Sequence, residues 1–273
     1  MPGAGIAAGG EFSLRRQAHE ARTPFLIIWL WPSLVWAGCG PKHDQMLYTS
    51  VIVAVSGGTG SGTVIHSAAK ADVWSTLVLT NFHVIGGAVS LSEEWDPKKG
   101  EKVEKERRQL VTIKWVDYNA CSKAIGTRGK SAEIVAYDKP ADLALLRLVD
   151  RENGVANVAL LFPESGTMHL MDEVWAVGAG LGEPPFATRG ELGGTDHQIQ
   201  GYRYLFATAP IIFGNSGGGL FRYSIDRKRF ELIGVPSKMR AAGFQAVSHM
   251  GFHIPIETVR EFLRANSFEK ILK

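Results

Sequence analysis

Cysteine is scarce in this sequence, and neither sign of charge dominates. Only two cysteines occur among 273 residues, which excludes a small scaffold held by several disulfides. Thirty Lys and Arg against 27 Asp and Glu leave a net charge of +3, too small a surplus for a surface that follows phosphates, so no nucleic-acid partner is expected. Paired Cys and His residues at zinc-binding spacings are missing, so neither a metal nor a cofactor is expected. No repeat of about 20 to 50 residues occurs, which excludes solenoids and propellers.

Long hydrophobic runs are missing as well. The uncharged apolar stretch Phe25–Gly38 has 14 residues, whereas a membrane-spanning helix needs about 20. Three arginines precede it, at positions 15, 16 and 22. This length and positive flank match the apolar region of a secretory signal.

The next residues, Trp36–Cys39, resemble a bacterial lipoprotein cleavage box, in which the cysteine becomes the lipidated first residue. We therefore expect residues 1–39 to be a signal peptide or a lipoprotein-type membrane-targeting segment, with Cys39 as the lipidation candidate. An uncleaved anchor and a buried amino-terminal helix remain open. The expected location is the bacterial envelope, periplasmic or membrane-anchored through the lipid or signal. Cys121 then has no partner, so no disulfide is predicted and Cys121 is assigned no role.

Glycine is abundant, with 31 residues beside 12 prolines, which favours short strands and tight turns. Apolar runs bounded by turn residues are typical of strands and fall into two sets. The first predicts strands over Tyr48–Val55, Gly62–Ile65, Val73–Leu79, Leu110–Val116, Ser131–Tyr137 and Leu143–Val149. The second predicts strands over Val158–Phe162, Glu173–Val177, Ala187–Leu192, Tyr202–Ala207, Gly219–Tyr223, Glu231–Val235 and Gly251–Ile254. Six strands make one barrel or sandwich, and the polar residues 151–157 form the crossing between the two halves.

Two further segments have distinct patterns. Glu93–Arg108 holds six acids and six bases, so its balanced charge predicts a solvated loop or hairpin rather than an anion-binding arm. After Pro255, apolar residues recur at helical spacing at Val259, Phe262 and Leu263. Arg260, Glu261 and Arg264 are expected on the opposite face. The pattern predicts a terminal amphipathic helix that covers the second half.

The phrase FGNSGGGL, Phe213–Leu220, is the first of three segments that carry chemistry. A serine hydroxyl is a weak nucleophile that needs a base and donors for the oxyanion it creates. Gly214 could present its N–H beside that of Ser216, and the glycines that follow let the chain turn sharply. A plain glycine-rich turn is the alternative.

The other two segments supply a base and a carboxylate. His83 follows the apolar strand that ends in Thr80 and Asn81, and Asp142 begins the apolar run ADLALL. A lone His is usually structural, and Asp142 could simply cap a turn, but a buried carboxylate needs a partner. The three residues occur in the order His, Asp, Ser with spacings of 59 and 74 residues, which is the order of chymotrypsin-type triads.

These segments resemble the trypsin-like serine peptidases, and among them the HtrA (Deg) peptidase domain without its PDZ domain. The resemblance covers about residues 48–265 and is carried by the phrases Gly60–Ile65, Leu79–Val84, Ala141–Leu146, Gly214–Gly218, Leu232–Gly234 and Gly251–Pro255. It implies an all-β fold of two perpendicular six-stranded β-barrels with a C-terminal amphipathic helix. The expected bounds are 46–152 and 153–256 for the barrels and 257–273 for the helix.

The implied activity is that of a serine endopeptidase acting on polypeptides. Ser216 is the expected nucleophile, His83 the base, Asp142 its orienting partner, and the N–H groups of Gly214 and Ser216 the oxyanion hole. A peptide-binding or chaperone pseudoenzyme of the same fold, or an esterase, stays the alternative. Asn215 stands where digestive relatives have a carboxylate that receives a new amino terminus, so activity without proteolytic activation is expected.

Specificity depends on a pocket beside the serine. Pro210 replaces the acid of trypsin-like pockets, and Pro236 replaces the His of glutamyl endopeptidases. The expected substrate-binding residues are Ile211, Ile212, Val235, Pro236, Ser237, Met239 and His253. The apolar walls at Ile211 and Met239 predict cleavage after aliphatic residues such as Val, Ala, Leu or Ile in envelope protein quality control or processing. His253, where the family has a small residue, either narrows the pocket and favours a polar side chain or packs as a structural residue.

Overall fold

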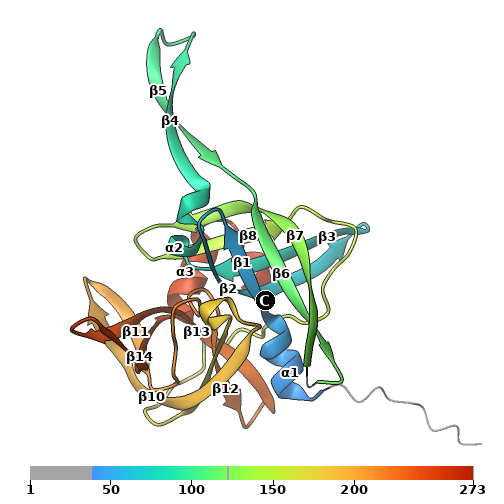
Figure 1. The fold of residues 1–273 in the computed structure, drawn as a ribbon, viewed down its shortest axis with the longest axis vertical. Coiled ribbons are helices and arrows are strands. Elements are labelled where there is room, and N and C mark those ends of the chain that lie inside the picture. The colour runs from blue at the N-terminus through green and yellow to red at the C-terminus, as the bar shows by residue number, and fades with distance from the viewer. Residues whose placement is uncertain (1–38, 122, 273) are drawn as a thin grey trace, which may run out of the picture. The chain divides into compact units, whose positions relative to one another are not determined.

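Two closed antiparallel β-barrels make up most of this protein (Figure 1). The computed structural model describes residues 39–121 and 123–272. The targeting segment expected before Cys39 lies outside the described residues. None of the helices in the described part is both long and apolar enough to cross a membrane.

The first barrel has the strand order β1-β2-β3-β8-β7-β6 and closes where β1 pairs with β6. Buried side chains such as Val53, Val64, Val78, Ile113 and Leu146 fill its interior. The strands are β1 (Ser50–Val55), β2 (Gly58–Lys70), β3 (Val73–Thr80), β6 (Val111–Asn119), β7 (Lys123–Asp138) and β8 (Leu143–Leu148).

The second barrel has the order β10-β11-β14-β13-β12-β9. Its strands are β9 (Glu173–Gly178), β10 (Phe186–Ile199), β11 (Tyr202–Ala207), β12 (Gly219–Ser224), β13 (Arg229–Ala242) and β14 (Gln245–Pro255). Helix α3 (Ile256–Ala265) follows and buries Val259, Phe262 and Leu263. Arg260, expected on the polar face, is buried as well, because its guanidinium donates a hydrogen bond to the carbonyl of Phe162.

Short helices precede, connect or follow these strands. They are α1 (Pro41–Gln45), η1 (Leu47–Thr49), α2 (Phe82–Ile85), η2 (Gly86–Ala88), η3 (Gly180–Gly182) and η4 (Glu269–Leu272). Helix α2 comes directly after β3 and therefore places His83 at the mouth of the first barrel.

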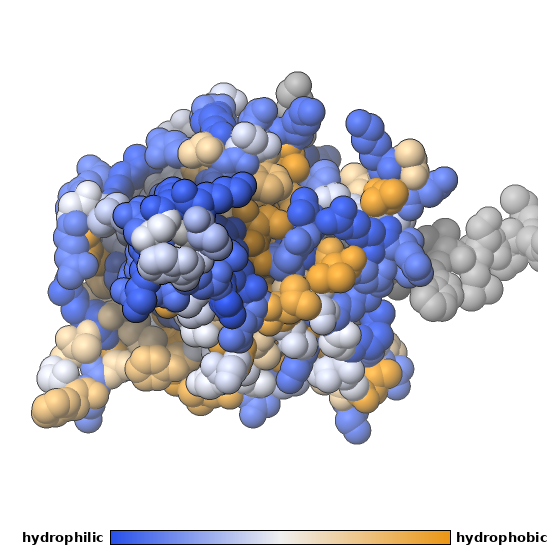
Figure 2. Space-filling view, turned by 90° about the horizontal axis from the view of Figure 1, so that it is seen from above, coloured by the Kyte–Doolittle hydropathy of each residue, from blue (hydrophilic) through white to orange (hydrophobic). Residues whose placement is uncertain are grey.

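A two-stranded ribbon of β4 (Val89–Asp96) and β5 (Glu101–Arg108) extends away from the first barrel (Figure 1). The balanced-charge segment is therefore a hairpin. Its register sets Glu93 opposite Glu104 and leaves Leu91 and Trp95 exposed. Seen from above, the end of the ribbon is mostly hydrophilic (Figure 2).

The expected all-β class, two-barrel architecture and C-terminal helix are confirmed. The strand predicted over Val158–Phe162 is wrong. In that segment only Leu161 forms an isolated bridge, to Leu232, because the six strands listed above already close the second barrel. Several strands are longer than predicted; β2 and β7, for example, extend into polar hairpins whose ends have no apolar pattern.

The prediction that no disulfide forms is also wrong. Cys39 and Cys121 are disulfide-bonded, with Cα atoms 5.5 Å apart across a sequence separation of 82 residues. The hydroxyl of Tyr48 donates a hydrogen bond to Cys39 Sγ at 3.0 Å. The sequence could not reveal this pairing, because it depends on where the β6–β7 turn lies relative to α1. Acylation at Cys39 would need the same sulfur, so the disulfide and the lipid exclude each other.

Candidate active site

His83 and Asp142 are paired at the edge of the first barrel. The Nδ1 atom of His83 lies 3.0 Å and 2.9 Å from the two carboxylate oxygens of Asp142, and the His83 backbone N–H donates to Oδ1 at 3.0 Å. Asp142 has a φ of 57°, a left-handed conformation that Asp tolerates better than most residues. This conformation at the start of β8 turns the carboxylate toward α2, so the pair has the geometry of a base and its orienting partner.

Two residues hold Asp142 in this position, one through its carboxylate and one through its backbone carbonyl. Ser237 Oγ donates to Oδ2 at 2.7 Å, and the side-chain amide of Asn81 donates to the Asp142 carbonyl at 2.9 Å. Burial raises the pKa of Asp142, but the hydrogen bonds and charge of His83 and the bond from Ser237 outweigh it, so the pKa lies below its usual value. Asp142 is therefore an anion at neutral pH, as the orienting role requires.

Ser216 follows a tight turn in the second barrel. Asn215 N–H donates to the Ile212 carbonyl at 3.0 Å, and Gly214 at the third turn position has a φ of 97°. These are the features of a type II turn, which favours glycine at that position. A Cβ on Gly214 would also lie 2.6 Å from the Ala179 carbonyl oxygen, so both conformation and space require glycine.

The type II turn sets the direction of the peptide between Phe213 and Gly214. The Phe213 carbonyl accepts a 2.7 Å bond from Leu181 N–H, and a trans peptide directs its N–H opposite to its carbonyl. Neither Gly214 N–H nor Ser216 N–H donates to an acceptor in the described part of the chain. The two donors expected for the oxyanion hole are therefore both free.

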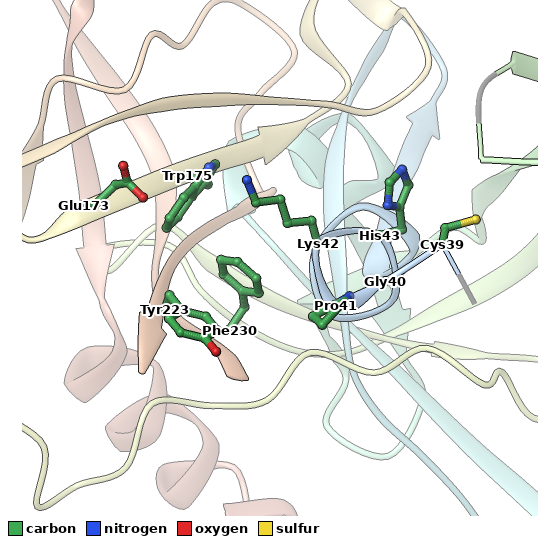
Figure 3. Close-up of a pocket in the computed structure, with 9 residues that line it drawn as sticks. All are labelled: Cys39, Gly40, Pro41, Lys42, His43, Glu173, Trp175, Tyr223 and Phe230. Carbon is green, nitrogen blue, oxygen red and sulfur yellow. The ribbon is translucent and has the colours of Figure 1, made fainter. Parts of the chain in front are cut away.

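A cleft of about 370 Å³ joins the two halves of the site, since His83, Gly214 and Ser216 all line it. Across residues 39–121 and 123–272 there is no hydrogen bond between Ser216 Oγ and the His83 ring, which is common for catalytic pairs without substrate. A larger cavity of about 560 Å³ lies elsewhere, beside α1, and is lined by Trp175, Phe230 and other residues outside the triad (Figure 3).

The expected substrate-binding residues divide by exposure. Ile212 and Met239 are half-buried, whereas Ile211, Val235 and Pro236 are buried. Pro236 uses its carbonyl to accept the Gly217 N–H at 3.0 Å.

Two residues that were expected to bind substrate, Ser237 and His253, have other surroundings in the structure. Ser237 directs its hydroxyl at Asp142, because a shift in the β13–β14 register between Pro236 and Lys238 interrupts the regular pairing at this residue. His253 is 0% exposed and lies in β14 with both ring nitrogens lacking hydrogen-bond partners among the described residues.

Sequence reasoning missed the supporting roles of Asn81 and Ser237. Asn81 lies in the phrase TNFH, but its contact with the Asp142 carbonyl depends on the pairing of β3 with β8. Asn215, which replaces a carboxylate of digestive relatives, accepts the Ile212 N–H through Oδ1 at 2.9 Å. This bond between two residues of the same turn stabilises the turn.

Comparison with known proteins agrees with this geometry. Residues 60–235 match the family model described as trypsin-like peptidase domain. Among solved structures, the chain is similar to the HtrA-type protease AlgW with a tripeptide, with a TM-score of 0.59, 19% identity and coverage of 84% of this chain and 63% of that one. It is also similar to the serine endoprotease from Yersinia pestis, with a TM-score of 0.55, 21% identity and coverage of 85% and 65%. No curated protein matches the sequence.

The chain spans less than two thirds of the length of these solved structures, and at such identities the likeness concerns the fold. In the described part, α3 and η4 follow the second barrel and no PDZ domain is formed. The family model covers more than half of the sequence. This chain therefore belongs to the trypsin-like peptidase family.

Proposed function

We propose that this protein hydrolyses peptide bonds in polypeptides with His83, Asp142 and Ser216 as its catalytic triad. Ser216 Oγ attacks the scissile carbonyl while His83 Nε2 takes its proton. Asp142 holds the Nδ1 proton of His83 and thereby keeps the ring in the tautomer that can accept. His83 then returns the proton to the leaving amine, and water repeats the sequence on the acyl-enzyme. The observation that carries this proposal is that His83, which is paired with Asp142, lines the same cleft as Ser216.

The negative oxygen of the tetrahedral intermediate rests on the N–H groups of Gly214 and Ser216. One of these N–H groups lies in the turn Ile212–Asn215 and the other directly after it. Both lack an acceptor within the described chain, so little reorganisation would accompany the reaction. Removal of one such donor in comparable enzymes costs about 3 to 4 kcal/mol of transition-state stabilisation.

The preferred substrates have a small or medium aliphatic residue before the scissile bond. The apolar side chains of Ile211 and Met239 support this preference, and each buried CH₂ group contributes about 0.8 kcal/mol. Pro210 and Pro236 leave no charged group at the two positions that select basic or acidic residues in relatives. The 14-residue apolar stretch at the amino end supports work in the bacterial envelope, in protein quality control or processing.

A fluorophosphonate probe tests the nucleophile directly. Wild-type protein should be labelled, Ser216→Ala should not, and hydrolysis should fall on the order of a millionfold. Ser56→Ala is the matched control, because Ser56 lines the same cleft without a role in the chemistry. Labelling that persists in Ser216→Ala would overturn the assignment.

The same experiment separates the alternatives. A pseudoenzyme would bind peptides without labelling in the wild type, and an esterase would hydrolyse peptide esters but not the matching amides. Mass spectrometry of cleaved peptide libraries reports the preference. Cleavage mainly after Lys, Arg, Asp or Glu would contradict the aliphatic pocket.

A further inference from the structure

The carbonyl groups of the turn that carries Ser216 all have donors. Within the described chain, the carbonyls of residues 212 to 216 accept hydrogen bonds from Asn215 N, Leu181 N, Ser61 Oγ, Gly218 N and Ser61 N respectively. Buried backbone groups are rarely left unpaired, so these bonds fix the orientation of each peptide. Two of the five come from one residue, Ser61, which belongs to β2 of the other barrel.

Ser61 uses all of its polar atoms at this contact. Its Oγ donates to the Gly214 carbonyl at 2.6 Å and accepts from Ala179 N–H at 2.7 Å. Its N–H donates to the Ser216 carbonyl at 2.8 Å, and its carbonyl accepts from Thr80 Oγ1 at 2.7 Å. The residue is completely buried, so water cannot replace the hydroxyl if it is removed.

The peptide that Ser61 Oγ holds lies between the two oxyanion donors. The Gly214 carbonyl belongs to the peptide joining Gly214 to Asn215, and the donors belong to the peptides on either side. Fixing the plane of this central peptide limits the rotation of both neighbouring peptides, because each is joined to it through only one φ and one ψ angle. Without the bond, the turn loses one restraint on its type II form. In the type I form, the Phe213 carbonyl would turn toward the oxyanion and the Gly214 N–H away from it.

We propose that Ser61 is a positioning residue that keeps the oxyanion hole formed, by clamping the Gly214 carbonyl from the opposite barrel. It touches neither substrate nor the reacting atoms. The proposal rests on the peptidase function proposed above. The clamp joins β2 of the first barrel to the end of β9 and the serine turn of the second. The oxyanion hole therefore stays formed only while the two barrels are packed together.

The packing around Ser61 is built for this contact. A Cβ on Gly178 would lie 2.8 Å from Ser61 Oγ, and a Cβ on Gly217 would lie 2.2 Å from the Ser61 carbonyl oxygen. Both glycines therefore leave room for the serine, and a side chain at either position would push the turn away from it.

The test compares Ser61→Ala with Ser67→Ala. Ser67 is a matched control on the same strand, because its Oγ pairs with Thr76 Oγ1 and accepts Val155 N–H, both at 2.9 Å, away from the cleft. On an aliphatic peptide amide, Ser61→Ala should lower kcat about 10- to 100-fold with KM within about twofold, a smaller loss than removal of a donor itself. Ser67→Ala should keep kcat within about twofold of wild type.

Binding measurements separate positioning from general damage. A peptide boronic acid ending in Val forms a tetrahedral adduct whose oxygen occupies the hole, whereas the same peptide with hydrogen in place of the boronic acid group has no oxygen to put there. Affinity for the boronic acid should fall in parallel with kcat/KM in Ser61→Ala, and affinity for the peptide without boron should stay unchanged. Ser61→Cys keeps a weak donor of similar size, so its kcat should lie between those of wild type and Ser61→Ala. This variant takes the place of Ser61→Ala in the test if the alanine variant does not fold.

Three results would overturn the proposal. One is a Ser61→Ala variant with kcat within twofold of wild type. Another is an equal loss of affinity for the boronic acid and for the same peptide without boron. The third, if alanine does not fold, is a Ser61→Cys variant with wild-type kcat. A wild-type protein that neither reacts with the fluorophosphonate nor cleaves peptides would instead refute the proposed function, and the two failures are thereby distinguished.

Discussion

Replacing His253 by leucine should make the folded protein less sensitive to acid. The imidazole is completely buried in β14, and burial lowers its pKa from 6.5 to about 3. Gly234 and Gly251 lie beside it, Leu205 and Pro236 pair with it on the neighbouring strands, and none of these residues carries a charge. In the unfolded chain the ring titrates near its usual pKa of about 6.5.

The sign of the effect follows from proton binding. Between pH 6.5 and about 3 the unfolded state holds a proton on His253 that the folded state lacks, so stability falls as pH falls through this window. Integration from pH 6 to pH 5 gives a loss of about 1 kcal/mol in the free energy of unfolding from this one group. Leucine has a similar volume and no titrating nitrogen, so that loss should vanish.

The assay is urea unfolding followed by tryptophan fluorescence at pH 5, 5.5, 6 and 7, in a Ser216→Ala background that prevents self-cleavage. From pH 6 to pH 5, the free energy of unfolding of His253→Leu should rise by about 1 kcal/mol relative to that of the parent. His249→Leu, at an exposed position of the same strand, is the control for histidine removal. Parallel pH curves for the parent and His253→Leu would refute the reasoning.

Three other outcomes follow from the site and the disulfide. Asp142→Asn should lower kcat on the order of 10⁴-fold in steady-state kinetics, because an amide favours the wrong tautomer of His83; a loss under tenfold would contradict the orienting role. Ser237→Ala should lower kcat/KM roughly tenfold, the equivalent of about 1.4 kcal/mol for a hydrogen bond to a carboxylate, and unchanged kinetics would show that the bond is dispensable. Reduction of the Cys39–Cys121 bond, or its replacement by two serines, should lower the free energy of unfolding by up to about 4.5 kcal/mol, from the loop entropy of an 82-residue separation; equal urea midpoints with and without reductant would contradict it.

Short local phrases were enough to predict much of the candidate site. His83, Asp142 and Ser216 each lie in a segment whose neighbours determine the local backbone, such as the glycines around Ser216. The structure brings His83 to Asp142 and places Ser216 in the same cleft. The two barrels could be predicted equally well from the sequence, because apolar runs between turn residues identify strands wherever one face is buried.

Contacts between distant segments were beyond such reasoning. The Cys39–Cys121 bond, the bond of Ser237 to Asp142 and the clamp of Ser61 on Gly214 each depend on how separate strands pack. The failed strand at Val158–Phe162 shows the reverse case, in which an apolar pattern is present but the barrel has no remaining place for it. Periodicity predicts which residues are buried, and only tertiary packing decides what they pair with.

The β4–β5 ribbon has a consequence for solubility. In the described part of the chain its strands pair only with each other, so each has an open edge that could add a further strand and begin a polymer. Its side chains oppose such growth. Glu93 already faces Glu104, and a third strand in the same register would bring a further carboxylate or a lysine into line with them. The interspersed acids and bases of Glu93–Arg108 therefore oppose the addition of a further strand at this exposed hairpin, where Leu91 and Trp95 are uncovered.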